Sequence, residues 1–303
     1  MRNPSPARRG THDLYDVAAV RDVVRRATEG DAGAAESLVR HVQDDVHNLA
    51  VRMLWCPDDA ADATQEILRK VVTRLAAFRG ESAFRTWVYR IAVNHLLDVR
   101  RSRVEREGLT FARFGASLAE GLTEPAAGWE SDPEQRVLVE EVKIGCTTGM
   151  LLCLDRAHRV AYVLGDVFEL TGEEAGEVLG VTPAAFRQRL ARARARLRAF
   201  MAAHCGLVSE SAACRCERRV RAAVDGGRVR PERLLFAHGA ADAAPHSRRQ
   251  LPVREQVGEQ VLEMDRLHRM AGVFRSHPRY RAPERVLQQV RRVLTSGRFS
   301  VLE

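Results

Sequence analysis

The sequence predicts an all-α protein with two helical domains joined by a flexible linker and followed by a helical C-terminal extension. Ala, Leu, Arg and Glu dominate long stretches in which apolar residues recur every three or four positions. Glycine, proline and β-branched residues are too sparse for a sheet protein. A chain of 303 residues, 45% hydrophobic and 29% charged, is long enough for two or three domains.

Breaks in the helical pattern place the domain boundaries. The breaks are rich in Gly, Ser, Thr and Pro and carry no sustained period. They predict a flexible tail over 1–12, a first domain over 13–107, a linker over 108–132, a second domain over 133–204 and an extension over 205–303. The last two helices of the extension are expected over 253–275 and 283–294.

Charge and cysteine content narrow the class of protein. The net charge of +8 predicts attraction to polyanions, although it also fits a merely basic protein. No apolar run is long enough for a membrane span, and the N-terminus lacks an apolar signal core, so a cytoplasmic protein is expected. Six irregularly placed cysteines argue against a disulfide framework and leave metal binding, redox chemistry or simple burial open.

The stretch "TGEEAGEVLGVTPAAFRQRL" predicts a helix-turn-helix. Thr171 and Glu174 form a capping-box pattern at the start of the first helix, and Gly180 is suited to end it. Thr182 is an N-cap residue with Pro183 at the first helical position of the second helix. The intervening turn is so short that the two helices must cross steeply, which is typical of this motif.

The second helix combines a buried stripe with a basic surface. The expected stripe is Phe186, Leu190, Ala193, Leu197 and Phe200. The flanks carry Arg187, Arg189, Arg192, Arg194, Arg196 and Arg198, and no acidic residue lies between Thr182 and Phe200. A solvated basic helix is the alternative, but mutual repulsion favours a polyanion such as DNA as the neutralising partner.

The beginning of such a helix faces base edges, whereas later arginines contact phosphates. The candidate DNA-binding residues are Thr182, Ala184, Ala185, Arg187, Gln188, Arg189 and Arg192.

Two stretches of the first domain resemble a known family. The sequence "FRGESAFRTWVYRIAVNHLLDVRR" and the preceding "DDAADATQEILRKVVTRLAAF" resemble region 2 of bacterial extracytoplasmic-function sigma factors, the promoter-specificity subunits of RNA polymerase. The helix-turn-helix, including "RQRLARARARLRAF", resembles region 4 of the same family. The resemblance covers residues 31–205 and leaves the extension unexplained.

The resemblance implies that the helix within "FRGESAFRTWVYRIAVNHLLDVRR", with its "RGES" loop, captures the minus-ten promoter element as it opens. Its apolar face, Phe84, Val88, Ala92, Leu96 and Val99, is expected to be core. Aromatic and arginine side chains on the other faces suit single-stranded bases. The candidates are Arg79, Ser82, Arg85, Trp87, Arg90, Asn94, Arg100 and Arg101, with a core role as the alternative for Trp87.

An acidic helix lies before this segment. By resemblance, its acidic face docks on the clamp helices of the largest polymerase subunit, and the polymerase flap is a further expected contact. The candidate polymerase-binding residues are Asp58, Asp59, Asp62, Gln65, Glu66 and Leu68. Simple solvation of the acidic face is the alternative. This chain also departs from the family pattern, because many relatives carry Phe near the position of Leu68.

The stretch "HCGLVSESAACRC" follows the basic helix. His204, Cys205, Cys214 and Cys216 are candidate zinc ligands, although their spacing is not CxxC. Redox-active thiols and plain structural cysteines are the alternatives, and the neighbouring arginines would favour the redox one. Cys146 and Cys153 are expected in the core.

The sequence therefore predicts a non-enzymatic sigma factor with promoter DNA and core RNA polymerase as partners. No cofactor is expected to be required. The extension, with an apolar stripe at Val257, Val261, Met264, Leu267, Met270 and Phe274, is expected either to restrain the two domains or to bind a regulator such as an anti-sigma factor.

The alternatives are a helix-turn-helix regulator that acts without polymerase and a metal-dependent hydrolase. The sequence argues against a hydrolase, because the chain has no HExxH motif, no nucleophile with a paired base and no Gly-rich phosphate loop.

Overall fold

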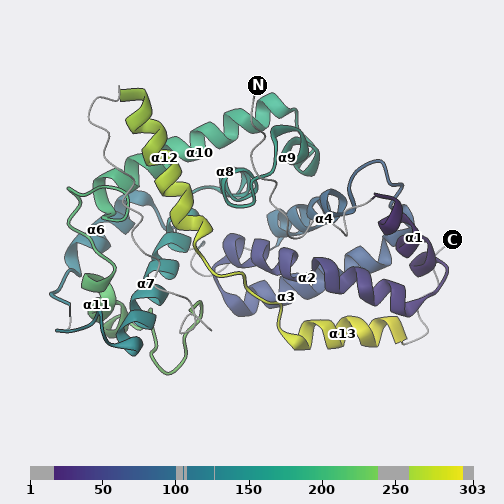
Figure 1. The fold of residues 1–303 in the computed structure, drawn as a ribbon, viewed down its shortest axis with the longest axis horizontal. Coiled ribbons are helices and arrows are strands. Elements are labelled where there is room, and N and C mark those ends of the chain that lie inside the picture. The colour runs from purple at the N-terminus through teal and green to yellow at the C-terminus, as the bar shows by residue number, and fades with distance from the viewer. Residues whose placement is uncertain (1–16, 100–104, 106–107, 126, 238–258, 296–303) are drawn as a thin grey trace, which may run out of the picture.

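A computed structural model describes residues 17–99, 105, 108–125, 127–237 and 259–295. The predicted tail over 1–12 lies outside these residues. The described chain is helical and elongated, with the first domain at one end and the helix-turn-helix domain at the other (Figure 1). The predicted all-α class is therefore confirmed.

The first domain is a bundle of α1 (Val17–Thr28), α2 (Ala32–Leu54), α3 (Pro57–Thr73) and α4 (Phe84–Asp98). A short 3-10 turn, η2 (Leu75–Ala77), follows α3. Asp31 caps α2 by accepting from the N–H of Ala34, and Pro57 opens α3. The predicted core face of α4 is buried except at Val99, which is half-buried.

The predicted linker contains a helix that sequence reasoning missed. Helix α6 (Phe111–Glu120) begins at Thr110, whose hydroxyl accepts from the N–H of Arg113. Phe111 and Phe114 pack on the ring of Phe200 in the basic helix. The prediction that this whole segment is irregular is therefore wrong, because one aromatic face attaches part of it to the second domain.

The helix-turn-helix domain contains α7 (Pro133–Leu152), α8 (Arg156–Tyr162), the π-helical turn η3 (Val163–Val167), α9 (Gly172–Leu179) and α10 (Pro183–His204). Its core is continuous with that of the first domain.

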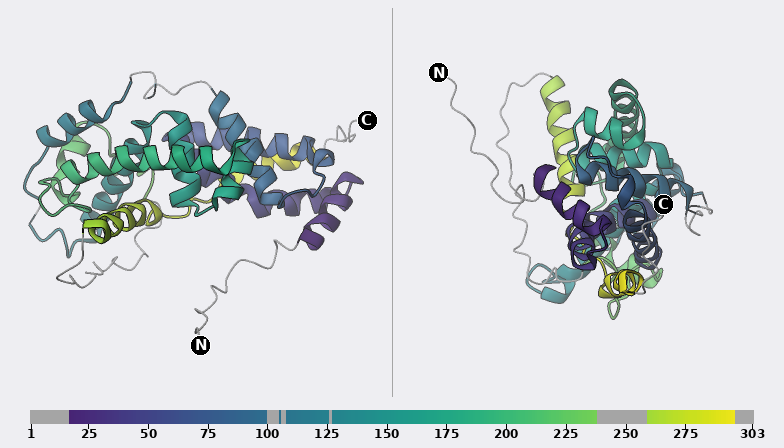
Figure 2. Two further views of the ribbon diagram at one scale, coloured as in Figure 1. Left: turned by 90° about the horizontal axis from the view of Figure 1, so that it is seen from above. Right: turned by 90° about the vertical axis from the view of Figure 1, so that its right-hand side faces the viewer.

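The extension contains η4 (Glu217–Arg219), α11 (Val220–Asp225), α12 (Glu259–Arg275) and α13 (Glu284–Thr295). Helix α12 packs on α10, η3 and α7, and α13 packs on α2 and α3. Helix α13 lies on the side of the α2–α3 pair opposite α4 (Figure 1), and the side views in Figure 2 also place α12 along the helix-turn-helix domain. No helix within the described ranges is long and apolar enough to cross a membrane.

A buried arginine joins the two domains. Arg159, 2% exposed, donates to the carbonyl of Met53 at the end of α2, to that of Leu151 at the end of α7 and to that of Leu154 just beyond it. Glu105 accepts from Arg159 at 2.8 Å and from Arg156 at 2.7 Å. Burial would raise the pKa of Glu105, but the hydrogen bond from Arg156 and the charge of Arg159 lower it to about 2. Glu105 is therefore ionised and pairs with both guanidinium groups.

A second arginine joins all three parts of the chain. The guanidinium of Arg52 lies 5.7 Å from the ring centroids of both Phe168, after η3, and Tyr280, in the extension. Next to it, Asn48 donates to the carbonyl of Tyr280 and accepts from its N–H. The extension is thus fixed to the first domain at the point where the two domains meet.

Replacing Glu105 with Gln should lower the free energy of unfolding by about 3 to 5 kcal/mol, because Arg159 would stay buried without a counter-charge. Urea unfolding measures the loss. Glu124→Gln is the matched control: its side chain is 84% exposed and pairs with Arg218, so a change below about 1 kcal/mol is expected. Equal effects for both variants would contradict the role given to Glu105.

Candidate nucleic-acid interface

The helix-turn-helix has the predicted local geometry. Thr171 and Glu174 form both hydrogen bonds of a capping box, at 3.2 and 2.8 Å. Gly180 ends α9 with φ +64°, a left-handed conformation that favours glycine. The hydroxyl of Thr182 accepts from the N–H of Ala185 and starts α10. The predicted apolar stripe of α10 is buried, so the basic flanks face outward.

The start of α10 leaves its candidate DNA-reading residues accessible. Thr182, Ala184, Arg187, Gln188 and Arg192 are exposed, whereas Ala185 and Arg189 are half-buried. An exposed arginine and glutamine in the first turns are suited to base edges in a major groove.

At least two of the six arginines, Arg194 and Arg196, have carboxylate partners, which corrects the prediction that all are unneutralised. Arg194 makes a bidentate pair with Asp166 in η3, and Arg196 lies 3.4 Å from Asp155. Both partners precede α10 in the chain, so a search of the helix alone cannot find them. The basic surface available to DNA is therefore concentrated toward the start of α10.

The predicted minus-ten surface on α4 faces the second domain. Arg90 donates to the carbonyl of Glu177 in α9 at 2.9 Å, and Tyr89 stacks on Phe168. Arg85 donates to the Tyr89 hydroxyl and pairs with Asp45. Of the other candidates, Arg79 and Asn94 are exposed, Ser82 is half-buried, and Arg100 and Arg101 lie outside the described residues.

Trp87 belongs to an aromatic cluster. Its ring packs on Phe78 and stacks on Phe84, with centroids 5.5 and 5.7 Å apart. The side chain is half-buried, so part of it packs in the domain and part is accessible. The core interpretation of Trp87 is thus supported for part of its surface, and stacking on promoter bases stays a prediction.

The acidic helix α3 presents some, but not all, of its candidates. Asp59 and Asp62 are exposed, Gln65 is half-buried, and Glu66 forms an ion pair with Arg69 at 2.6 Å. Asp58 lies 3.5 Å from Arg285 in α13 and 3.8 Å from Arg233. Leu68 is 0% exposed and belongs to the core, so the prediction that it contacts polymerase is wrong for this conformation.

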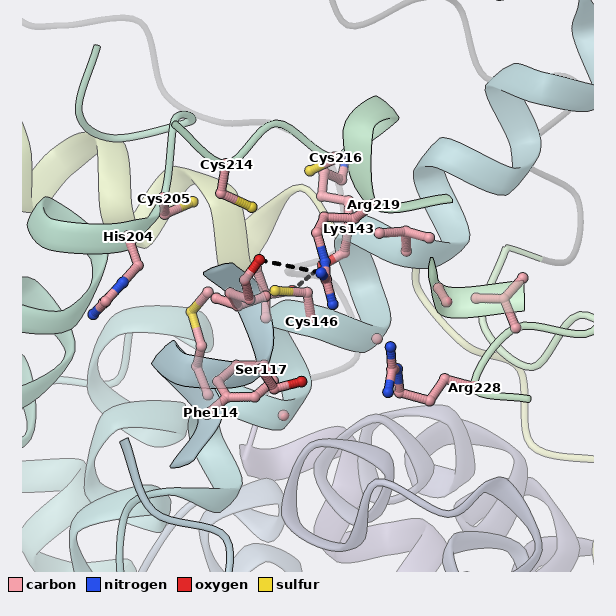
Figure 3. Close-up of a pocket in the computed structure, with 18 of the residues that line it drawn as sticks. Phe114, Ser117, Lys143, Cys146, His204, Cys205, Cys214, Cys216, Arg219 and Arg228 are labelled. Atoms are coloured by element: carbon pink, nitrogen blue, oxygen red, sulfur yellow. Dashed lines mark hydrogen bonds between the residues drawn. The ribbon is translucent and has the colours of Figure 1, made fainter. Parts of the chain in front are cut away.

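The predicted zinc ligands are only partly brought together. Backbone pairing brings Cys205 beside Cys214, and Cys216 follows on the same loop. His204 packs its ring on Phe200 instead and points away from these thiols (Figure 3). Cys146 of α7 lies on their side of the cavity. Among the residues described, no three His, Cys, Asp or Glu side chains are grouped closely enough to hold a metal ion.

Burial dominates the chemistry of these thiols. It raises the pKa of Cys205 and Cys214, and the nearby Arg215 lowers it by less. It also raises the pKa of Cys216 well above its ordinary value. The proximity of arginines therefore does not produce the low-pKa thiolates that the redox interpretation needs.

These features define a DNA-binding protein of the helix-turn-helix class with a second helical domain that carries an acidic helix. Models of known protein families match both domains. The model described as Sigma-70 region 2 matches residues 38–106, and the model described as Sigma-70, region 4 matches residues 145–197.

The individual relatives are also named as sigma factors. The ECF RNA polymerase sigma factor SigE of Mycolicibacterium smegmatis is 32% identical, over 60% of this chain and 68% of its own length. RNA polymerase sigma factor NccH of Alcaligenes xylosoxydans is 32% identical, over 62% and 97%. A solved structure of CnrH in complex with the cytosolic domain of CnrY covers 60% of this chain and 96% of its own, with 24% identity and a TM-score of 0.39, too weak a likeness to compare domain arrangements.

The chain belongs to the extracytoplasmic-function sigma factors. It acts with RNA polymerase and directs transcription initiation at promoters. The alternative of a regulator that acts without polymerase is not favoured.

Arg187→Ala should weaken binding to the cognate minus-thirty-five sequence by about 1 to 3 kcal/mol and relax discrimination at one base pair, because a base contact would be lost. Transcript starts on genomic fragments would supply the promoter, and competition between matched and mismatched duplexes would measure the change. Arg192→Ala, predicted to remove a phosphate contact, should weaken all sequences alike. A uniform loss for Arg187→Ala would identify that residue as a phosphate contact too.

Proposed function

We propose that this sigma factor exists in a closed state held by its own C-terminal extension, and that opening exposes its polymerase and promoter surfaces. The observation that carries the proposal is the direct packing of α9 on α4, with the extension bound to both domains. In this arrangement the guanidinium of Arg90, a candidate for minus-ten recognition, already donates a hydrogen bond to the backbone carbonyl of Glu177.

The spacing of promoter elements supports this proposal. Elements centred about 10 and 35 base pairs upstream of a start lie about 25 base pairs apart, or roughly 85 Å along the duplex. The helix-turn-helix and the minus-ten surface touch through α9 and α4 in this structure. The two domains must therefore separate before both elements can be bound at once.

The position of α13 supports a second point of control. Val286, Leu287 and Val290 are buried where α13 packs on α2 and α3. Arg285 is placed 3.5 Å from Asp58, and Arg291 binds Glu36 at 2.8 Å. Positively charged residues of the extension thus cover part of the acidic surface that we propose as the contact with the clamp helices of the polymerase.

We assign roles to individual residues from the accessibility of their side chains. Asp58, Asp59 and Asp62 are proposed to contact the clamp helices after α13 leaves, while the second domain contacts the flap. Arg79, Trp87, Arg90 and Asn94 are proposed to hold the opened minus-ten element, by stacking and by charge. The extension performs the restraint that a separate anti-sigma factor would otherwise supply.

Reversing two charges of α13 should release it. In the Arg285→Glu, Arg291→Glu double variant, attraction to Asp58 and Glu36 becomes repulsion, which shifts the closed equilibrium by about 1 to 2 kcal/mol. Affinity for core RNA polymerase should rise about fivefold to thirtyfold, measured by titration with labelled protein.

A matched control is available next to α13. Arg279→Glu with Arg281→Glu changes the net charge equally, but both side chains are exposed and form no ion pair among the described residues. This control should leave polymerase affinity unchanged. An equal rise in both double variants would show that charge alone, rather than release of α13, determines binding.

Acid should loosen the extension. Nε2 of His277 lies 2.6 Å from the Thr147 hydroxyl. Burial, with the charges of Arg52 and Lys143, lowers the pKa of His277 from 6.5 to about 3. The docked form binds a proton at His277 less readily than the open form. The contribution of neutral His277 to docking is therefore full above pH 6.5 and is lost as pH falls toward 3, by up to about 1.4 kcal/mol per pH unit.

Hydrogen exchange of α13 at pH 7 and pH 5 tests this expectation, after correction for intrinsic exchange rates. Opening should increase at pH 5 in the natural protein, and His277→Gln should remove most of the difference. A pH dependence that survives His277→Gln would assign the effect to other groups, such as the buried His47.

A further inference from the structure

A cavity of about 440 Å³ lies where the linker helix, the helix-turn-helix domain and the extension meet. Phe114 and Leu118 of α6, Met150 of α7 and Phe236 of the extension supply apolar walls, and Trp55 at the end of α2 reaches the same space. A volume in this range with largely apolar walls is typical of small-molecule sites.

The charges around the cavity are unbalanced. Four cationic side chains line it, Arg113, Lys143, Arg219 and Arg228, with Glu141 as the one carboxylate among the lining residues. Glu141 already accepts hydrogen bonds from the N–H groups of Leu235, Phe236 and Ala237 at 2.7 to 2.9 Å.

Two of the cations have their own partners. Lys143 pairs with Glu140 at 2.6 Å, and Arg113 donates to the carbonyl of Gly108. The imbalance therefore falls on Arg219 and Arg228.

Arg219 is a buried cation without a carboxylate partner in the described chain. It is 5% exposed, and it donates to the carbonyl of Leu118 at 3.1 Å. Burial lowers the pKa of Arg219, and the positive charge of Arg228 lowers it further; the neighbouring Cys214 and Cys146 raise it. Arg228 donates to the carbonyl of Ala222. Two guanidinium groups, the buried one of Arg219 and the exposed one of Arg228, thus border one cavity without a counter-anion, which is unfavourable for the buried charge of Arg219.

Figure 3 shows how these groups face the cavity. The guanidinium of Arg219 lies beside the Cys146 side chain, and Arg228 points toward the same region from the right of the view. The thiols of Cys205, Cys214 and Cys216 lie along another part of the wall. Because burial raises the pKa of these thiols, they are neutral and do not balance the arginines.

We infer that this cavity binds a small amphipathic carboxylate, with its anionic group on Arg219 and Arg228 and its apolar body against Phe114, Met150 and Phe236. A planar guanidinium matches a carboxylate with two parallel hydrogen bonds. The apolar walls then bury a chain or ring that water solvates poorly. The ligand fills a space bounded by both domains and the extension, so this site is separate from the DNA-binding and polymerase-binding surfaces.

The test uses the full chain under reducing conditions with octanoate and 2-naphthoate as probes and 1-octanol as the uncharged control. Calorimetry measures affinity, and the fluorescence of Trp55, identified by its loss in Trp55→Phe, reports the site. We expect saturable binding of at least one carboxylate, about tenfold or more tighter than 1-octanol, because the charged contact is absent in the alcohol.

Three variants locate the anionic group. Arg219→Met should weaken carboxylate binding about tenfold or more, and Arg228→Gln should weaken it severalfold. Arg228 is exposed and donates to one carbonyl in the described chain, so this variant keeps the test decisive if Arg219→Met fails to fold. Arg221→Gln, a 77% exposed arginine of α11 paired with Asp225, is the matched control and should bind like the natural protein.

Three results would overturn the inference. They are absence of saturable binding to either carboxylate, equal affinity for 1-octanol, and unchanged affinity in both Arg219→Met and Arg228→Gln. A thiolate absorbance already present at neutral pH and lost in Cys146→Ser would show instead that a cysteine balances Arg219. Polymerase binding is not a readout, so failure here leaves the closed-state proposal standing.

Discussion

The ion-pair network of Glu105 with Arg156 and Arg159 is the constraint on which the arrangement of the domains depends. A guanidinium as deeply buried as that of Arg159 is tolerated only where its donors find acceptors and its charge is balanced. Those acceptors come from the ends of α2 and α7 and from Glu105, which lie far apart in sequence. Separating the domains would expose this network to water, which solvates all of its members. The proposed opening would therefore exchange one state in which these charges are satisfied for another.

Local features were predictable from sequence. The capping box at Thr171, the glycine at Gly180 and the proline after Thr182 each act within one helical turn, and the apolar period of α10 identifies its buried face without knowledge of any neighbour. Helix α6 carried a similar signal at Phe111, Phe114 and Leu118, but surrounding glycines and a proline obscured it. Fold class and the helix-turn-helix thus follow from the chain alone.

Contacts between distant segments were not predictable in the same way. Asp166 neutralises Arg194 from a different helix, Glu177 occupies Arg90 from the other domain, and Cys146 approaches the loop cysteines while the adjacent His204 turns away. Each of these contacts depends on packing between elements, which spacing along one helix does not encode. Leu68 is different, because it shares the three- and four-residue spacing of the buried residues Thr64, Val71 and Val72, and the period of α3 alone places it in the core.

The covalent connection between α12 and α13 through residues 276–283 has a quantitative consequence. An inhibitor on the same chain is present at a fixed effective concentration, on the order of millimolar for a short connection, whatever the amount of protein in the cell. In the proposed closed state, raising expression therefore increases open and closed molecules in constant proportion. The restraint and the domains that it would hold are made in equal amounts, so no imbalance between two gene products can arise.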